Sequence, residues 1–283
     1  MDRQRPFERD WDYLLVLDAA RYDVFAEVYA EYFDGTLRKF DSEASATPEW
    51  VDTHFEGFQD VTYFSANPYV NSLPLPLNET GTVVYETTPA EHLSRVVDVW
   101  DSGWDEGLGT VRPEAVTREF MTERDRVDGR TVLHFMQPHA PFLGRGQGRI
   151  NRSIRNSFRS LKETGAAGGL GGLLGDRLSG AVERLEGSET AMKIGMLSNL
   201  GARSLLEVLT GNARETLLAY HEENLRGALD SVAPVARSLD GRVVVTSDHG
   251  EAFGEEGVWG HHVETHIPEL VEVPWLEVEG VAA

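Results

Sequence analysis

Short apolar runs alternate with longer amphipathic segments along most of the chain. Four runs rich in β-branched and aromatic residues predict buried strands: 13–17, 61–64, 131–136 and 242–246. Three segments with helical patterns or start signals predict helices: 22–32, 48–55 and 215–239. Strands that alternate with helices in this way predict an α/β fold, with a mainly parallel sheet covered by helices on both faces.

Residues 144–211 interrupt this rhythm, and we expect them to form a helical insertion in a single domain that spans residues 1–283. Six cations and no carboxylate occur from Arg145 to Lys162, at steps of three or four, so one helix would carry them on a single face. This stripe is either a solvated face paired with acidic neighbours, or a lid or docking surface. In the second case residues 145–162 would contact an anionic substrate, a charged glycan or the headgroups of a membrane surface.

The charge balance is strongly acidic, with 47 Asp and Glu against 26 Lys and Arg, and a net charge of −21. An anionic surface with few lysines stays hydrated in concentrated salt, which indicates a halophilic protein, although an ordinary acidic protein is the alternative. The same charge excludes bulk nucleic-acid binding. The first residues are charged and no apolar run is long enough for a membrane span, so we expect a cytoplasmic protein.

Metal-ligand residue types occur where two of the predicted strands end. Asp18 follows the first strand, and the adjacent pair Asp248-His249 follows the last one, with Gly250 allowing a tight turn. A carboxylate oxygen and an imidazole nitrogen can share one divalent ion. Because the chain contains no cysteine, a thiolate site and a cysteine nucleophile are excluded.

Further histidines lie near these positions. His139 stands between Pro138 and Pro141, on a stiff loop that would suit a substrate contact or form a simple turn. His261, His262 and His266 follow the Asp-His pair closely and indicate a polar floor of a site. We expect His261 to bind metal or steady a leaving oxygen, whereas the other two are either site residues or ordinary surface groups.

Four motifs follow one another along the chain: Asp18, Ala66-Asn67-Pro68-Tyr69, Pro138-His139-Ala140-Pro141, and Thr246-Ser247-Asp248-His249-Gly250-Glu251 with Trp259-Gly260-His261. In this order they resemble the motifs of sulfatase-like proteins of the alkaline phosphatase superfamily, in a salt-adapted, haloarchaeal-type version. The resemblance runs from about residue 12 to residue 278 and is weakest over 144–211. It implies an alkaline phosphatase-like three-layer sandwich.

The resemblance also implies a nucleophile at a helix N-terminus. Sulfatases carry a cysteine or serine oxidised to formylglycine, with proline two places later and arginine two beyond that. Here Ala46 stands two before Pro48 and Trp50 occupies the arginine position. An unmodified hydroxyl nucleophile therefore fits better, with Ser45 as first choice and Thr47 as second.

For the metal, the resemblance implies one divalent ion (Mn, Mg, Ca or Zn) held by Asp18, Ser45, Asp248 and His249. Two-metal members use a further Asp and His four residues apart, and no histidine in this chain has an acidic residue four positions before it. Catalytic assistance is expected from His139, His261 and Arg21, unless Arg21 is tied to Asp23.

The sequence therefore predicts a metal-dependent hydrolase or transferase that acts on a phosphate or sulfate ester through a covalent intermediate. The expected substrate is a small-molecule, glycan or lipid-headgroup ester. Two alternatives remain: a true sulfatase with an atypical nucleophile, and a non-catalytic binder of anionic glycans or lipids.

Overall fold

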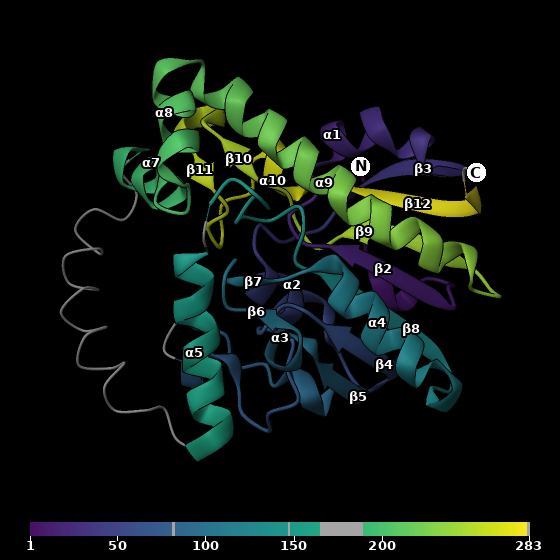
Figure 1. The fold of residues 1–283 in the computed structure, drawn as a ribbon. Coiled ribbons are helices and arrows are strands. Elements are labelled where there is room, and N and C mark those ends of the chain that lie inside the picture. The colour runs from purple at the N-terminus through teal and green to yellow at the C-terminus, as the bar shows by residue number, and fades with distance from the viewer. Residues whose placement is uncertain (81–82, 147, 165–188, 282–283) are drawn as a thin grey trace.

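A computed structural model describes residues 1–80, 83–146, 148–164 and 189–281. An eight-stranded sheet runs through the middle of the molecule, in the order β1-β3-β12-β9-β2-β8-β4-β5 (Figure 1). Its strands are β1 (Asp2–Arg3), β2 (Tyr13–Leu17), β3 (Phe33–Asp41), β4 (Gln59–Ser65), β5 (Leu93–Asp98), β8 (Arg130–Phe135), β9 (Val243–Ser247) and β12 (Glu272–Val281). Two small two-stranded sheets join β6 (Trp104–Asp105) to β7 (Thr110–Val111) and β10 (Ala252–Phe253) to β11 (Trp259–Gly260).

In the eight-stranded sheet, neighbouring strands are parallel except at β12, which pairs antiparallel with both β3 and β9. The helices are α1 (Tyr22–Val28), α2 (Thr47–His54), α3 (Val99–Ser102), α4 (Pro113–Glu123), α5 (Arg149–Thr164), α7 (Glu189–Leu197), α8 (Ala202–Thr210), α9 (Ala213–Arg237) and α10 (Pro268–Val271).

The central strand β2 explains the three layers. Its Leu14 and Val16 pack into one apolar cluster, which also contains Trp50 of α2, whereas Leu15 and Leu17 pack into the other, which contains α1, α4 and α9 residues. Successive side chains of a strand point to opposite faces, so an uninterrupted apolar run needs cover on both sides. The predicted α/β fold, a mainly parallel sheet with helices on both faces, is confirmed.

Along the chain, helices α5, α7 and α8 come between β8 and α9, in the range where the insertion was expected (Figure 1). The middle part of that range, residues 165–188, lies outside the described residues. Helix α7 packs against β11 and α8 against α9. The division into one domain of residues 1–283 with a 144–211 insertion stays a prediction.

The basic stripe of α5 faces carboxylates of neighbouring segments. Arg155 pairs with Glu106 at 3.0 Å, and Lys162 pairs with Asp98 at 2.8 Å. Phe158 is buried against Trp100, and Lys162 Nζ lies over the same Trp100 ring at 5.3 Å. These pairs match the alternative in which the stripe is paired with acidic neighbours, although Arg155 is buried and not solvated, and they give no support to a membrane contact through 145–162.

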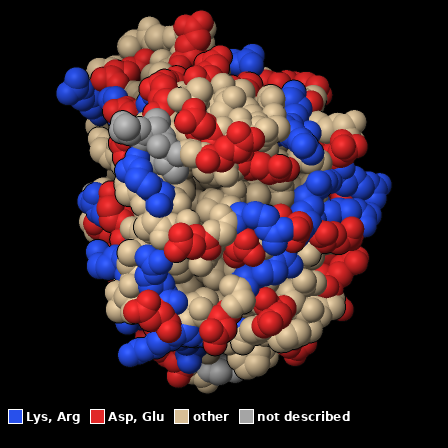
Figure 2. Space-filling view, turned by 90° about the vertical axis from the view of Figure 1, so that its right-hand side faces the viewer, with Lys and Arg blue, Asp and Glu red and all other residues tan. Residues whose placement is uncertain are grey.

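Acidic and basic side chains are interspersed on the face shown in Figure 2. Exposed ion pairs of this kind include Lys39 with Glu272 and Arg226 with Glu31. Within the described ranges, no helix is both long enough and apolar enough to cross a membrane.

Candidate metal and phosphoester site

The site lies at the C-terminal ends of β2 and β9 and at the N-terminus of α2. Because β2 and β9 are parallel neighbours, the residues that follow them, Asp18 and Asp248, meet at one edge of the sheet. Thr47 is the first residue of α2 and approaches from above this edge. All three side chains are at most 3% exposed.

The hydroxyl of Thr47 is placed by two hydrogen bonds. It donates to Asp248 Oδ2 at 2.8 Å and accepts from Asn67 Nδ2 at 2.9 Å. Asn67 Nδ2 also donates to Asp18 Oδ2 at 2.7 Å, so one amide joins the hydroxyl to the second carboxylate. The Thr47 oxygen also lies at the N-terminus of a helix, where the macrodipole favours negative charge.

The imidazole of His249 completes this group. Its Nδ1 lies 2.8 Å from the Gly250 carbonyl and must donate there, which leaves Nε2 as an acceptor, 3.4 Å from Thr47 Oγ1. Nε2 lies 3.5 Å from Asp18 Oδ1 and 3.6 Å from Asp248 Oδ2. Among the described residues, Asp18 Oδ1 has no hydrogen-bond partner. Three buried electron-pair donors thus face one point, an arrangement that fits a divalent cation.

Electrostatics support this reading of the first cluster. Burial and the neighbouring Asp248 carboxylate raise the pKa of Asp18 well above its usual range. Burial also opposes the charge of Asp248, but His249, His134 and the Thr47 hydroxyl together lower the pKa of that carboxyl. A cation bound between the two carboxylates would offset their mutual repulsion and the cost of burying their charges.

A second cluster adjoins the first and consists of His139, Glu251 and His261, whose ligand atoms lie within 4.8 Å of one another. The His261 ring centroid is 4.8 Å from that of His139 and 4.6 Å from that of His249. His261 Nδ1 lies 3.0 Å from Glu251 Oε1. His139 Nδ1 is buried and has no partner in the part of the chain that the structure describes.

The charges of the second cluster follow from burial and from each other. Burial, with the nearby His261, lowers the pKa of His139 to about 3, so this ring is neutral near pH 7. Burial raises the pKa of Glu251, but His261, His139 and His249 together lower it to about 2. A neutral imidazole beside an ionised carboxylate is the form in which both residue types bind metal.

The structure separates the two hydroxyls between which the sequence could not decide. Ser45 Oγ lies 2.7 Å from Glu49 Oε2 and 2.7 Å from the His262 carbonyl, and it accepts from Thr265 N. This network anchors the loop after His261. Thr47, not Ser45, contacts the Asp248 carboxylate of the candidate metal site.

Arg21 is also placed away from the chemistry. Its guanidinium is 2% exposed and bonds Asp23 at 2.7 Å and Glu255 at 2.6 Å. It also donates to the Glu251 carbonyl at 3.0 Å. The residue thus holds the backbone behind the second cluster, as in the alternative that ties it to Asp23.

Two remaining histidines stand beside the site. His266 Nε2 lies 2.7 Å from Glu49 Oε1, and the His262 ring lies 3.1 Å from the Trp259 carbonyl. Both help to fix the loop that carries His261.

Asn67 and Glu251 belong to the sequence motifs, but the sequence predicted no role for either of them. For Glu251 the signal was its place two residues after His249, where a turn can bring it to His261. No sequence pattern predicted that Asn67 would donate hydrogen bonds to Asp18 and Thr47.

No family model and no curated protein matches the sequence. Among solved structures, the chain resembles the integral membrane lipooligosaccharide phosphoethanolamine transferase A of Neisseria meningitidis, with 12% identity and a TM-score of 0.48. This match covers 94% of the chain but 47% of that protein, so the chain spans about half of its length.

The soluble domain of the same transferase gives 11% identity and a TM-score of 0.47, over 93% of this chain and 74% of that domain. The C-terminal periplasmic domain of the phosphoethanolamine transferase EptC from Campylobacter jejuni gives 12% and 0.44, over 93% and 77%. These likenesses concern the fold. The expected cytoplasmic location is nevertheless contradicted, because the neighbours are an integral membrane protein and periplasmic domains, and we withdraw it. An acidic surface by itself does not distinguish the compartments.

Proposed function

We propose that this protein is a metal-dependent phosphoester hydrolase or transferase in which Thr47 is the nucleophile. The observation that carries the proposal is the hydrogen bond between Thr47 Oγ1 and Asp248 Oδ2 at a buried cluster of cation ligands. A hydroxyl becomes a nucleophile where an acceptor takes its proton and positive charge stabilises the alkoxide. Asp248, the helix N-terminus and a bound cation would meet these needs.

The two clusters differ in the ions that they suit. Asp18, Asp248, His249 and Thr47 offer mainly oxygen, which suits Mn, Mg, Ca or Zn. The second cluster has two imidazoles and one carboxylate, which favours Zn or Mn. We therefore propose a two-ion site in place of the single ion expected from the sequence. Divalent ions in these positions would supply Lewis acidity and offset charge on the phosphoryl oxygens.

The residues of the chain have separate tasks in this reaction. Asn67 donates to Thr47 Oγ1 and so orients the hydroxyl, and the electron pair that the O–H bond releases on deprotonation attacks phosphorus. Asp248 Oδ2 accepts the hydroxyl proton. As the new oxygen–phosphorus bond forms, the bond to the leaving alcohol breaks and the alcohol takes up a proton. Water or an acceptor alcohol then releases the phosphoryl group from Thr47.

Phosphate esters are favoured over sulfate esters by the identity of the nucleophile. Formylglycine is an aldehyde made from a cysteine or serine side chain. Thr47 carries a methyl group on Cβ, so its oxidation would give a ketone and not that aldehyde. A covalent phosphothreonine is the simpler intermediate for a Thr47 hydroxyl that already bonds its proton acceptor.

Turnover of aryl phosphate monoesters, aryl phosphodiesters and aryl sulfates by the metal-loaded protein tests the proposal. We expect turnover of a phosphate ester, and intact-protein mass spectrometry should detect a phosphorylated species in the parent and none in Thr47→Ala. Asn71→Ala, a buried amide that bonds the Pro68 carbonyl, is the matched control. Equal activity in Thr47→Ala and parent would refute the assignment, and turnover of sulfates alone would favour the sulfatase alternative.

A further inference from the structure

One amide side chain reaches from the N-terminal segment into the interior between the two elements that carry Thr47 and Asp248. Gln4 is 0% exposed. Its Oε1 accepts from Trp50 Nε1 at 2.9 Å, and its Nε2 donates to Thr246 Oγ1 at 2.9 Å and to the Ser247 carbonyl at 2.7 Å. Both the oxygen and the nitrogen of the amide are therefore engaged, on opposite sides.

The partners of this amide are direct neighbours of the reactive groups. Trp50 lies in α2, three residues after Thr47, and Ser247 immediately precedes Asp248. Thr246 Oγ1 in turn donates to the Pro274 carbonyl of β12 at 2.6 Å. The amide thus ties the first turn of α2 to the end of β9.

The backbone around Gln4 is fixed as firmly as its side chain. Gln4 N donates to the Asp41 carbonyl at 2.8 Å, and Arg9 Nε donates to the Gln4 carbonyl at 2.5 Å. The next residue, Arg5, has a left-handed backbone with φ of 38°, which residues other than glycine rarely adopt. Packing and hydrogen bonds must therefore hold this turn in place.

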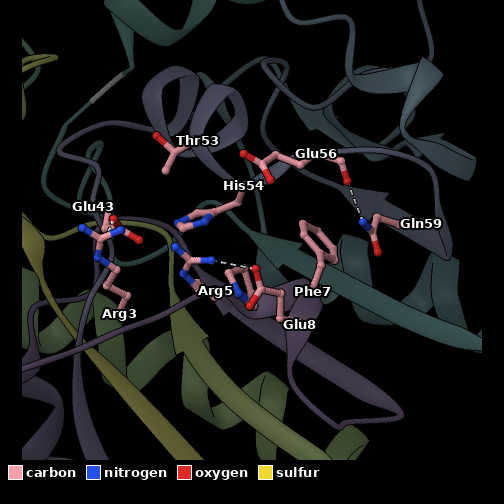
Figure 3. A pocket seen from close by; sticks show the side chains of 10 residues that line it. Arg3, Arg5, Phe7, Glu8, Glu43, Thr53, His54, Glu56 and Gln59 are labelled. Carbon is pink, nitrogen blue, oxygen red and sulfur yellow. Dashed lines mark hydrogen bonds and ion pairs between the residues drawn. The ribbon is translucent and has the colours of Figure 1, made fainter.

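The residues on either side of Gln4 have a different environment. Arg3 and Arg5 line a surface pocket of about 290 Å³ beside Thr53 and His54, at the C-terminal end of α2 (Figure 3). Their guanidiniums pair with Glu43 and Glu8. Only the middle residue of the three is directed into the protein.

We propose that Gln4 is a positioning residue, which sets the spacing between the Thr47 hydroxyl and the Asp248 carboxylate by bracing α2 against β9. The inference rests on the proposed function, since it concerns the same nucleophile. Gln4 acts through Trp50 and Ser247. A displacement of about 1 Å at a nucleophile is enough to reduce a rate on the order of 100-fold.

Gln4→Met tests the inference, because methionine has nearly the same length and forms none of the three hydrogen bonds. We expect kcat for an aryl phosphodiester to fall about 10- to 100-fold while KM changes less than about threefold. Mn²⁺ affinity, measured by titration, should weaken by about tenfold, because Asp248 loses its fixed neighbour. Thermal melting checks that the variant is folded.

Trp11→Phe is the matched control. It removes a buried hydrogen bond of the same segment, from Trp11 Nε1 to the Pro6 carbonyl at 2.7 Å, without removing a bond to α2 or β9. Its kcat and Mn²⁺ affinity should stay within about twofold of the parent at a similar loss of melting temperature.

A double-mutant cycle with Trp50→Phe locates the effect. If the brace acts as one unit, kcat of Gln4→Met with Trp50→Phe should be no lower than kcat of Gln4→Met alone. A folded Gln4→Met protein with the kcat and Mn²⁺ affinity of the parent would overturn the inference. Should Gln4→Met fail to fold, Trp50→Phe decides, because of the three hydrogen bonds of the amide it removes only the one to α2. Trp11→Phe is then the control for the loss of indole packing.

The proposed function is judged on the parent protein, and this inference on the ratio of variant to parent. If the parent turned over no ester, the proposed function would fail, while the Mn²⁺ affinities of parent and Gln4→Met would still decide the role of Gln4.

Discussion

Thr47 Oγ1 and Asp248 Oδ2 form a 2.8 Å hydrogen bond although 201 positions separate the two residues in the chain. Asp248 follows a central strand, and Thr47 begins a helix that packs on the sheet. The contact therefore depends on the whole parallel sheet, and it brings a hydroxyl into a group of buried carboxylates and an imidazole. The predictions below follow from this group and from the buried charges around it.

The first prediction separates the two hydroxyls of the α2 N-terminus. Thr47→Ala should lower kcat by at least about 1000-fold, because the nucleophile is lost. Thr47→Ser, which keeps the oxygen, should retain measurable activity. Ser45→Ala should keep most of the activity and lose about 1 kcal/mol of unfolding free energy, since its hydroxyl bonds Glu49. Steady-state kinetics with an aryl phosphodiester, alongside urea unfolding, measures both effects. The opposite ranking of the two alanine variants would return the role to Ser45.

The second prediction concerns the number of metal ions. The parent should bind two divalent ions per chain, and Glu251→Gln should bind one, because the second cluster loses its carboxylate. Asp248→Asn should lose the ion of the first cluster and the activity with it. Elemental analysis after equilibrium dialysis counts the ions, and His266→Gln, whose ring bonds Glu49, serves as control. One ion in both parent and Glu251→Gln would contradict the two-ion proposal.

Much of the fold could be predicted from the sequence because the central strands are buried on both faces. Residues 13–17 and 131–136 read as continuous apolar runs and became β2 and β8, within one residue at each end. Four strands of the eight-stranded sheet, β1, β3, β5 and β12, were missed. In β3 exposed and buried positions are mixed, as in FDGTLRKFD, and no local pattern reveals that its partner lies more than 200 residues away.

Only the site residues that directly follow predicted strands could be predicted from the sequence. Asp18, Asp248 and His249 stand at strand ends, and parallel strands bring such ends together. The sequence could not decide between Ser45 and Thr47, because the residue at which α2 begins determines which of the two hydroxyls faces Asp248. The Asn67 and Gln4 contacts depend on tertiary packing and left no periodic signal.

The third prediction concerns the buried ion pair of Arg21 and Glu255, whose side chains are 2% and 5% exposed. Arg21→Met should lower the unfolding free energy by about 3–5 kcal/mol, because the buried Glu255 carboxylate loses its buried cation and keeps only the half-exposed Arg214 and the Phe253 N–H as partners. The double variant with Glu255→Gln should recover part of this loss. In urea unfolding, Lys39→Met at the exposed pair with Glu272 should cost less than about 1 kcal/mol. An equally small effect of Arg21→Met would disprove the structural role.

The fourth prediction concerns the pH dependence of stability through His54. Its Nε2 donates to the Ser42 carbonyl at 2.7 Å, and burial lowers the pKa of the ring to about 4. An unfolded histidine titrates near 6.5, so between about pH 6.5 and 4 the unfolded chain binds a proton that the folded protein excludes. The stability associated with neutral His54 is fully present above about pH 6.5 and is lost as the pH falls towards 4. The total is on the order of 3 kcal/mol.

His54→Gln keeps a donor for the Ser42 carbonyl but cannot titrate. Its unfolding free energy, measured in urea at pH 7, 5.5 and 4, should therefore fall with acidification by about 3 kcal/mol less than that of the parent, whatever its stability at pH 7. Thr53→Ala, from the same pocket, should follow the slope of the parent because the change involves no titrating group. Parallel curves for His54→Gln and parent would mean that this ring takes up its proton without unfolding, and a neutral, buried His54 would then have to be abandoned.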